Sequence, residues 1–166
     1  MRNKPVKEQD GVYMKIRMRP FDIVLNILCL ILLIGIVIYL AIRWSSIPEQ
    51  VPGHFNLSGE VTRWDSKETL IVLPVIAWII FIGFSILEQF PQVWNTGVRI
   101  TQENMHRVYG ILKTLLSTIK LLIVATFTSI TIIQSLALGL SWWVALYPVL
   151  IIGTVIFSLI RLVKAR

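Results

Sequence analysis

The sequence is poor in reactive side chains and in charge. Its 166 residues include one cysteine and two histidines, and only 15% of them are charged. A single cysteine excludes an intramolecular disulfide, and Cys29 lies in an apolar stretch, which is typical of a small packing residue. With 55% hydrophobic residues, the composition is typical of a membrane protein.

Acidic residues are scarcer than basic ones, nine against sixteen, which gives a formal net charge of +7. Such an excess can indicate nucleic-acid binding. Here, however, the basic residues flank apolar stretches and do not form one patch. Membrane topology and anionic lipid headgroups account for the charge better, so the expected partner is a lipid bilayer and no nucleic acid.

Four long apolar runs dominate the chain, at residues 23–42, 69–87, about 115–137 and 141–160. Each is close to the ~20 residues that a helix needs to cross the hydrocarbon core of a bilayer. Helices are the default, because lipid cannot satisfy an open backbone. The sequence therefore predicts an all-α integral membrane protein with four transmembrane helices. Pro74 and Pro148 fall within the second and fourth runs and predict kinks.

The basic residues predict the orientation. Twelve lie in the tail 1–22, in the connection 89–114 and after the fourth run, whereas the other two connections hold only Arg43, Arg63 and Lys67. Basic residues concentrate on the cytoplasmic side. Both termini are therefore expected in the cytoplasm, and the loop between the first two runs is expected outside. The protein is expected in the bacterial cell membrane as a multi-pass protein.

The chain divides into four parts on this interpretation. Residues 1–22 form a basic cytoplasmic tail with an interfacial segment, and 23–88 form the first helix pair with an outer loop at 44–68. Residues 89–114 form a cytoplasmic connection and the start of the third helix. Residues 115–166 form the second helix pair and a short cytoplasmic tail.

The loop 44–68 contains most of the residues with a specific chemical character. Pro52 and Gly59 are expected to shape its backbone so that His54 and Asn56 project together. Trp64 is expected to anchor the loop at the membrane interface, and Lys67 to close it onto the second helix. The loop is therefore predicted to be ordered, either as a recognition surface or as a connector.

The sequence gives less support for two other functions of this loop. A metal site would need Glu49, Glu60 or Asp65 to join His54, and their spacing matches no known ligand pattern, so no metal or cofactor is expected. An enzyme would pair His54 with Ser58, Ser66 or Lys67, but nothing in the spacing enforces such a pair. A membrane enzyme centred on His54 remains an alternative to a protein without catalytic activity.

The third run has a polar stripe with helical spacing, which is expected to face other helices because polar groups are costly in lipid. Lys120 lies about 7 Å inside the inner boundary at 1.5 Å per residue. Glu88 and Asn26 lie at a similar depth in the first two helices. This polar intramembrane region is either an ion pathway or a packing contact in which Lys120 also reaches toward the interface. The stripe comprises Lys113, Ser117, Lys120, Thr128, Thr131 and Ser135, with Val124 as its one apolar member.

The order of residues in the outer loop resembles a small bacterial membrane domain of unknown function. The resemblance runs over about residues 24–85 and rests on Ile47-Pro48, Val51-Pro52-x-His54-Phe55-Asn56-x-x-Gly59, Trp64-x-Ser66-Lys67 and Leu73-Pro74. This domain is found in SdpI-type immunity proteins. The resemblance implies protection of a producing cell from a secreted toxic peptide and a report of the toxin to a regulator.

The predicted function is therefore that of a non-enzymatic membrane protein of a sensing or toxin-immunity type. Its outer loop would bind a peptide, a lipid headgroup or a partner protein. The partners expected for the whole protein, besides the lipid bilayer, are a secreted peptide or a membrane or cytoplasmic protein. The alternative is a small transporter or transporter accessory subunit that uses the polar region around Lys120 and Glu88.

Overall fold

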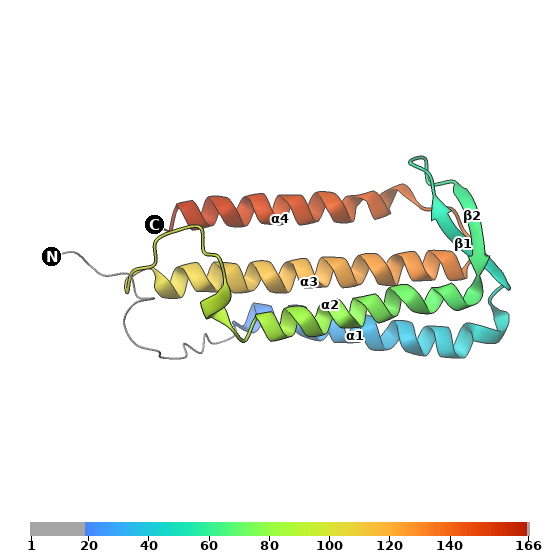
Figure 1. The fold of residues 1–166 in the computed structure, drawn as a ribbon, viewed down its shortest axis with the longest axis horizontal. Helices are drawn as coiled ribbons and strands as arrows, with labels where there is room; N and C mark the ends of the chain where they lie inside the picture. The colour runs from blue at the N-terminus through green and yellow to red at the C-terminus, as the bar shows by residue number, and fades with distance from the viewer. Residues whose placement is uncertain (1–18, 166) are drawn as a thin grey trace.

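The computed structural model describes residues 19–165 and shows four long helices lying side by side (Figure 1). Each is long and apolar enough to cross a membrane. Their ends agree with the apolar runs to within a few residues, except that the third extends ten residues farther toward the N-terminus. The helices are α1 (Pro20–Arg43), α2 (Val72–Leu87), α3 (Met105–Ser135) and α4 (Leu146–Val163).

The segment between α1 and α2 contains a β-hairpin, which the sequence analysis did not predict. Strand β1 (Gln50–Phe55) pairs antiparallel with β2 (Val61–Ser66), and the register is irregular on both sides of His54. Short 3₁₀ turns join the hairpin to the helices, η2 (Trp44–Ser46) after α1 and η3 (Lys67–Ile71) before α2. The hairpin lies across one end of the bundle, which we call the hairpin end (Figure 1).

The prolines expected to kink two helices lie near helix starts. Pro74 is the third residue of α2, and Pro148 is the third residue of α4. The turn before each helix is a 3₁₀ turn, η3 before α2 and η5 (Trp142–Ala145) before α4. A proline is tolerated in the first turn of an α-helix because its missing N–H would have no partner there.

Helix α3 is the central element and packs against α1, α2 and α4. Its polar stripe is buried, as the spacing predicted. The stripe residues are spaced three or four apart, so they share one face of the helix. Each residue of the stripe is less than one-tenth exposed. The stripe comprises Lys113, Ser117, Lys120, Val124, Thr128, Thr131 and Ser135.

Apolar side chains fill the bundle in three clusters along its length. One lies under the hairpin and includes Leu40, Val51 and Leu70. The second lies at mid-length around Leu33 and Val124. The third lies at the opposite end, which we call the terminal end. It joins residues of the connection between α2 and α3 to residues of α3 and to the C-terminal part of the chain. Its members are Trp94, Ile100, Val108, Tyr109, Ile111, Leu112, Leu162 and Ala165.

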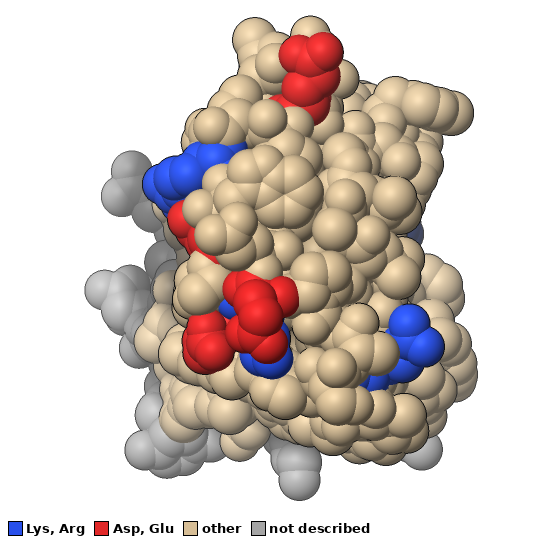
Figure 2. Space-filling model, turned by 90° about the vertical axis from the view of Figure 1, so that its right-hand side faces the viewer, with Lys and Arg blue, Asp and Glu red and all other residues tan. Residues whose placement is uncertain are grey.

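Most of the outward-facing side chains on the four helices are large and apolar, particularly on α1 and α4. At the hairpin end, by contrast, the mostly uncharged surface carries a few charged groups, several of which lie next to a group of opposite sign (Figure 2). Apolar sides with polar side chains turned inward are the arrangement expected of helices whose solvent is lipid.

Candidate functional site

The hairpin is fastened to the far end of α3 and to the connection that follows it. The Gln134 side-chain Nε2 donates to the Pro52 carbonyl at 2.8 Å. The Leu140 N–H donates to the Gly59 carbonyl at 2.8 Å. Gly59 has a φ of +82°, and a Cβ at this position would stand 2.2 Å from the Leu140 oxygen. Glycine is therefore required in this turn both for its backbone conformation and for the close approach of the chain.

A cleft of about 540 Å³ lies between the hairpin and the ends of α2 and α3, and we call it the hairpin cleft. This volume is within the range of ~300–1,000 Å³ usual for small-molecule sites. We call the apolar lining residues of α2, α3 and the connection after α3 its floor, and the polar lining residues its roof. The lining residues are Gly53, His54, Phe55, Asn56, Asp65, Thr69, Val72, Leu73, Ile130, Gln134 and Leu140.

His54 and Asn56 both line this cleft, but their side chains differ in their freedom to bind a ligand. The Asn56 amide holds the hairpin turn: its Oδ1 accepts from the N–H groups of Ser58 and Glu60, and its Nδ2 donates to the Glu60 carboxylate at 2.8 Å. The His54 imidazole is exposed and has no hydrogen-bond partner within residues 19–165. The two residues therefore border the same cleft, with the Asn56 amide engaged in the turn and the His54 imidazole unengaged, and their role in binding stays a prediction.

The other predicted loop residues are spread around the hairpin. Pro52 is buried, and its carbonyl binds α3. Trp64 lies opposite Pro52 in the register and is 50% exposed. Lys67 begins η3, forms an ion pair with Glu49 at 2.6 Å and lies 5.8 Å from the centre of the Trp44 ring. Lys67 therefore ties the hairpin to the end of α1 through Trp44 and leads directly into α2.

An ion pair that the sequence analysis did not single out borders the cleft. The Arg63 guanidinium donates twice to the Asp65 carboxylate, at 2.9 and 2.8 Å. This hydrogen bonding and the carboxylate charge raise the pKa of Arg63 above its ordinary value. Alternate residues of a strand face the same side, so the i, i+2 spacing was the available signal. No group of three or more potential metal ligands occurs in the described part of the chain.

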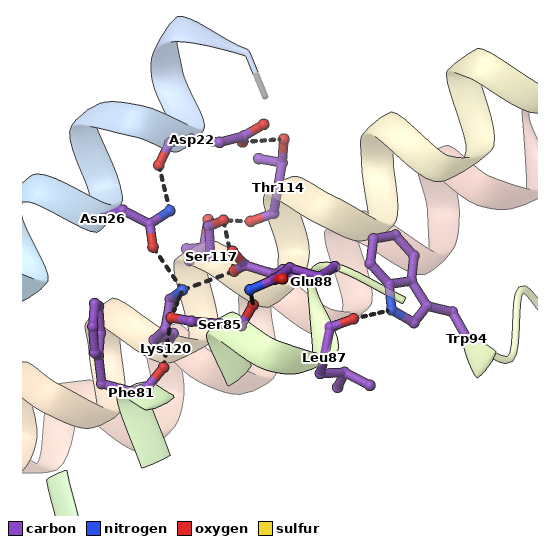
Figure 3. Close-up of polar contacts among 12 residues, drawn as sticks. Asp22, Asn26, Phe81, Ser85, Leu87, Glu88, Trp94, Thr114, Ser117 and Lys120 are labelled. Atoms are coloured by element: carbon purple, nitrogen blue, oxygen red, sulfur yellow. Dashed lines mark hydrogen bonds and ion pairs between the residues drawn. The ribbon is translucent and has the colours of Figure 1, made fainter. Parts of the chain in front are cut away.

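A second polar site lies inside the bundle, toward the terminal end, and we call it the ionic cluster (Figure 3). The Lys120 amine contacts the Glu88 carboxylate at 3.0 Å, the Asn26 Oδ1 at 2.6 Å and the Ser85 hydroxyl at 3.1 Å. It also lies 5.1 Å from the centre of the Phe81 ring. The structure thus brings together the three residues that sequence analysis placed at similar depth, and it adds others. The full cluster is Asp22, Asn26, Ser85, Glu88, Thr114, Ser117 and Lys120.

Hydroxyl groups complete the cluster around its two carboxylates. The Ser117 hydroxyl donates to Glu88 at 3.0 Å, and the Thr114 hydroxyl donates to Asp22 at 2.7 Å. Asn26 donates to the Asp22 backbone carbonyl at 2.7 Å. Spacing could have revealed part of this set, because Ser85 precedes Glu88 by three residues and Asp22 precedes Asn26 by four, which places each pair on one helix face.

The position of Lys120 corrects one expectation. Its side chain was expected to face the first or second helix, and its amine bonds acceptors on both α1 and α2. The added expectation that it also reaches toward the interface does not agree with the structure, because the side chain is completely buried. Glu88 is buried to almost the same degree, at 3% exposure. A buried ammonium in contact with a carboxylate and two neutral acceptors has no need to extend toward water.

Comparison with known proteins finds one family match. Residues 30–78 match a family described as a domain of unknown function (DUF1648). The match covers most of α1, the whole hairpin and the start of α2, and it lies inside the range of the resemblance noted in the sequence. It assigns no activity.

A relative is similar over a comparable length. An uncharacterized protein of Archaeoglobus fulgidus is 33% identical over 66 residues, which cover 35% of this chain and 36% of that protein. The chain therefore spans about a third of the length of the curated relative that it matches. No solved structure matches.

Proposed function

We propose that this chain is a multi-pass protein of a bacterial cell membrane, with both termini in the cytoplasm and the hairpin outside. In this arrangement the hairpin is a recognition element of a sensing or toxin-immunity protein. The observation that carries the proposal is the hairpin cleft: an exposed pocket whose roof presents the imidazole of His54 without a partner. A buried polar group would need a partner, whereas an exposed and unengaged one is available to a ligand.

The way the hairpin is held supports recognition over a simple connection. Gln134, Leu140 and Lys67 fasten it to three different parts of the bundle. A connector that only joins two helices needs no such fastening. Pre-organisation of a binding surface lowers the entropic cost of association, which is what an ordered hairpin offers to a ligand.

A protein without catalytic activity agrees best with the surroundings of His54. Within residues 19–165, no hydroxyl, thiol or amine forms a hydrogen bond with its imidazole. Catalysis by a nucleophile and a base requires the two groups within hydrogen-bonding reach. Of the serines considered as a nucleophile, Ser58 lies in the hairpin turn, where its N–H binds Asn56, and Ser66 is the residue before η3.

The ionic cluster supports the alternative of a small transporter or a transporter accessory subunit, because charged residues inside a membrane often mark ion or proton paths. Its geometry agrees better with packing. Lys120 has no exposed surface, and its contacts join α1, α2 and α3. A transport role would require these contacts to break and reform during each cycle.

The test uses cells of the source organism from which this gene has been deleted, complemented with single variants and grown in spent medium of the parent strain. We expect His54→Ala to lose protection against the spent medium while its level in the membrane stays normal. Ile156→Ala, at an exposed position on α4, which contributes no residue to the lining of the cleft, is the control and should protect fully. Equal protection by both variants would refute the recognition role. Loss of protection only in Lys120→Met would favour transport.

A further inference from the structure

The hairpin cleft combines an apolar surface, which suits lipid, with a polar surface, which suits water or lipid headgroups. Its floor consists of Val72 and Leu73 at the start of α2, Ile130 on α3, and Leu140. Val72 is 52% exposed on the side of the bundle. The floor therefore continues onto a helix surface that would lie against lipid. A ligand that fills it would have an apolar part.

The roof of the cleft offers both signs of charge within one strand. Asp65 lines the cleft, and Arg63 holds its carboxylate in a bidentate ion pair. His54 is opposite Arg63 in the register, and paired residues of antiparallel strands share a face. A carboxylate accepts about four hydrogen bonds, so Asp65 keeps capacity for a further donor.

Gln134 adds an acceptor to this roof. Its Nε2 is used by the Pro52 carbonyl, and no contact to its Oε1 occurs among the described residues. The cleft thus presents two acceptors, Asp65 and Gln134, and one nitrogen group that can donate, His54. Arg63 does not line the cleft, but its guanidinium is held at the border of the cleft by its bonds to Asp65. This pattern complements a ligand that carries an ammonium next to a phosphate.

Aromatic residues place this cleft at the level of a membrane interface. Trp142 and Trp143 follow Leu140 by two and three residues, and both are exposed. Tryptophan concentrates where lipid headgroups begin. At this level the apolar floor would meet acyl chains, and the polar roof would meet headgroups.

We propose that the hairpin cleft binds a zwitterionic aminophospholipid. Its ammonium donates to Asp65 and Gln134, its phosphate accepts from His54 and Arg63, and the start of an acyl chain lies against Val72 and Ile130. This inference rests on the proposed function, because it names the ligand class of the recognition element. The hairpin then senses the lipid composition of the outer leaflet.

The test compares two lipids that differ only in the ammonium. The purified full chain is equilibrated in mixed micelles containing equal amounts of phosphatidylethanolamine and phosphatidylcholine with identical acyl chains, and retained lipid is counted by native mass spectrometry. The trimethylated ammonium of phosphatidylcholine cannot donate hydrogen bonds. We expect phosphatidylethanolamine to be retained about tenfold more, as one charge-assisted hydrogen bond implies.

Three variants test which groups are responsible. Asp65→Asn should reduce the preference to near unity, and Ile130→Trp should fill the floor and abolish retention of both lipids. Leu57→Ala, in the exposed turn of the same hairpin, is the matched control and should keep the preference, because Leu57 does not line the cleft. A thermal unfolding scan of each variant separates loss of the site from loss of the fold.

Equal retention of the two lipids by the unmodified chain would overturn the inference, and so would an unchanged preference in Asp65→Asn. The lipid assay uses purified protein and the protection assay uses cells, so the two proposals can fail separately. Loss of lipid preference with His54-dependent protection intact would leave a recognition hairpin whose ligand is a peptide or protein. Intact lipid preference with no His54-dependent protection would leave a lipid site without a protective role.

Discussion

Lys120 is the residue whose surroundings differ most from those of a typical lysine. It is the largest of the fully buried side chains in the described part of the protein. An ammonium without partners in such a place would cost several kcal/mol, and the ion pair with Glu88 and the bonds to Asn26 and Ser85 offset that cost. Asn26 is on α1, Ser85 is on α2, and Glu88 is the residue that follows α2. The Lys120 Nζ on α3 therefore links three helices.

Removing one charge of this pair should destabilise the protein, and removing both should cost less than the sum of the two single losses. We expect Lys120→Met to lower the free energy of unfolding by about 3–5 kcal/mol, because Glu88 would be left buried without its cation. Glu88→Gln should have a similar effect, and the double variant should lose clearly less than the sum. Unfolding in mixed micelles with increasing denaturing detergent measures this difference.

The control is Lys164→Met, which replaces an exposed lysine after α4 and should leave stability almost unchanged. Additive losses in the double variant would show that Lys120 and Glu88 act independently. Unchanged stability in Lys120→Met together with lost function would show that the ionic cluster is a pathway and not a packing contact.

Among the elements, the hairpin depends on its turn more than on its strands. The two strands together have one buried apolar side chain apart from Pro52, that of Val51. An isolated two-stranded hairpin is marginally stable in water. The turn bonds of Asn56 and the contact of Gly59 with Leu140 therefore decide whether the hairpin stays docked.

Gly59→Ala should loosen the hairpin from the bundle. A left-handed backbone costs an L-residue about 1–2 kcal/mol, and the added Cβ also collides with the Leu140 oxygen. We expect faster hydrogen–deuterium exchange in peptides that cover residues 50–66, with the exchange of α3 unchanged. Gly83→Ala is the control, because a Cβ there meets nothing within 4 Å. Equal exchange in the two variants would show that the turn does not hold the hairpin.

At the scale of the whole molecule, α3 is longer than a membrane is thick. Its 31 residues extend about 46 Å at 1.5 Å per residue, against ~30 Å of hydrocarbon. Part of α3 must therefore lie outside the hydrocarbon core of a bilayer. The buried cluster around Trp94 and Tyr109 covers its first turns at the terminal end.

The proposed orientation predicts the accessibility of single cysteines in intact cells. Ser58→Cys, in the exposed hairpin turn, should react with a membrane-impermeant thiol reagent. Gln102→Cys, exposed in the connection before α3, should react only after the cells are opened. The native Cys29 is fully buried and should contribute little background. The reverse pattern would place the hairpin in the cytoplasm and would remove the basis for external recognition.

Several features of this protein follow from its sequence alone, because their causes are local. A run of about 20 apolar residues predicts a spanning helix, and the spacing of polar residues from Lys113 to Ser135 predicted the buried face of α3. Asn56 and Gly59 indicated a turn. The strands on either side were missed because Pro52 and Gly53, in the middle of β1, are both disfavoured in strands and hide the alternating pattern.

Tertiary structure alone decided which groups meet. Lys120 could have turned toward the interface or toward any neighbouring helix; the packing of α1 and α2 against α3 directs it to Asn26, Ser85 and Glu88. The hairpin cleft likewise needs α2, α3 and the residues after α3 to converge beneath His54. The pattern of polar and apolar residues within one helix or strand depends on neighbours in the sequence. The contacts of the ionic cluster and of the cleft instead join residues up to about a hundred positions apart. Their geometry depends on how whole elements pack.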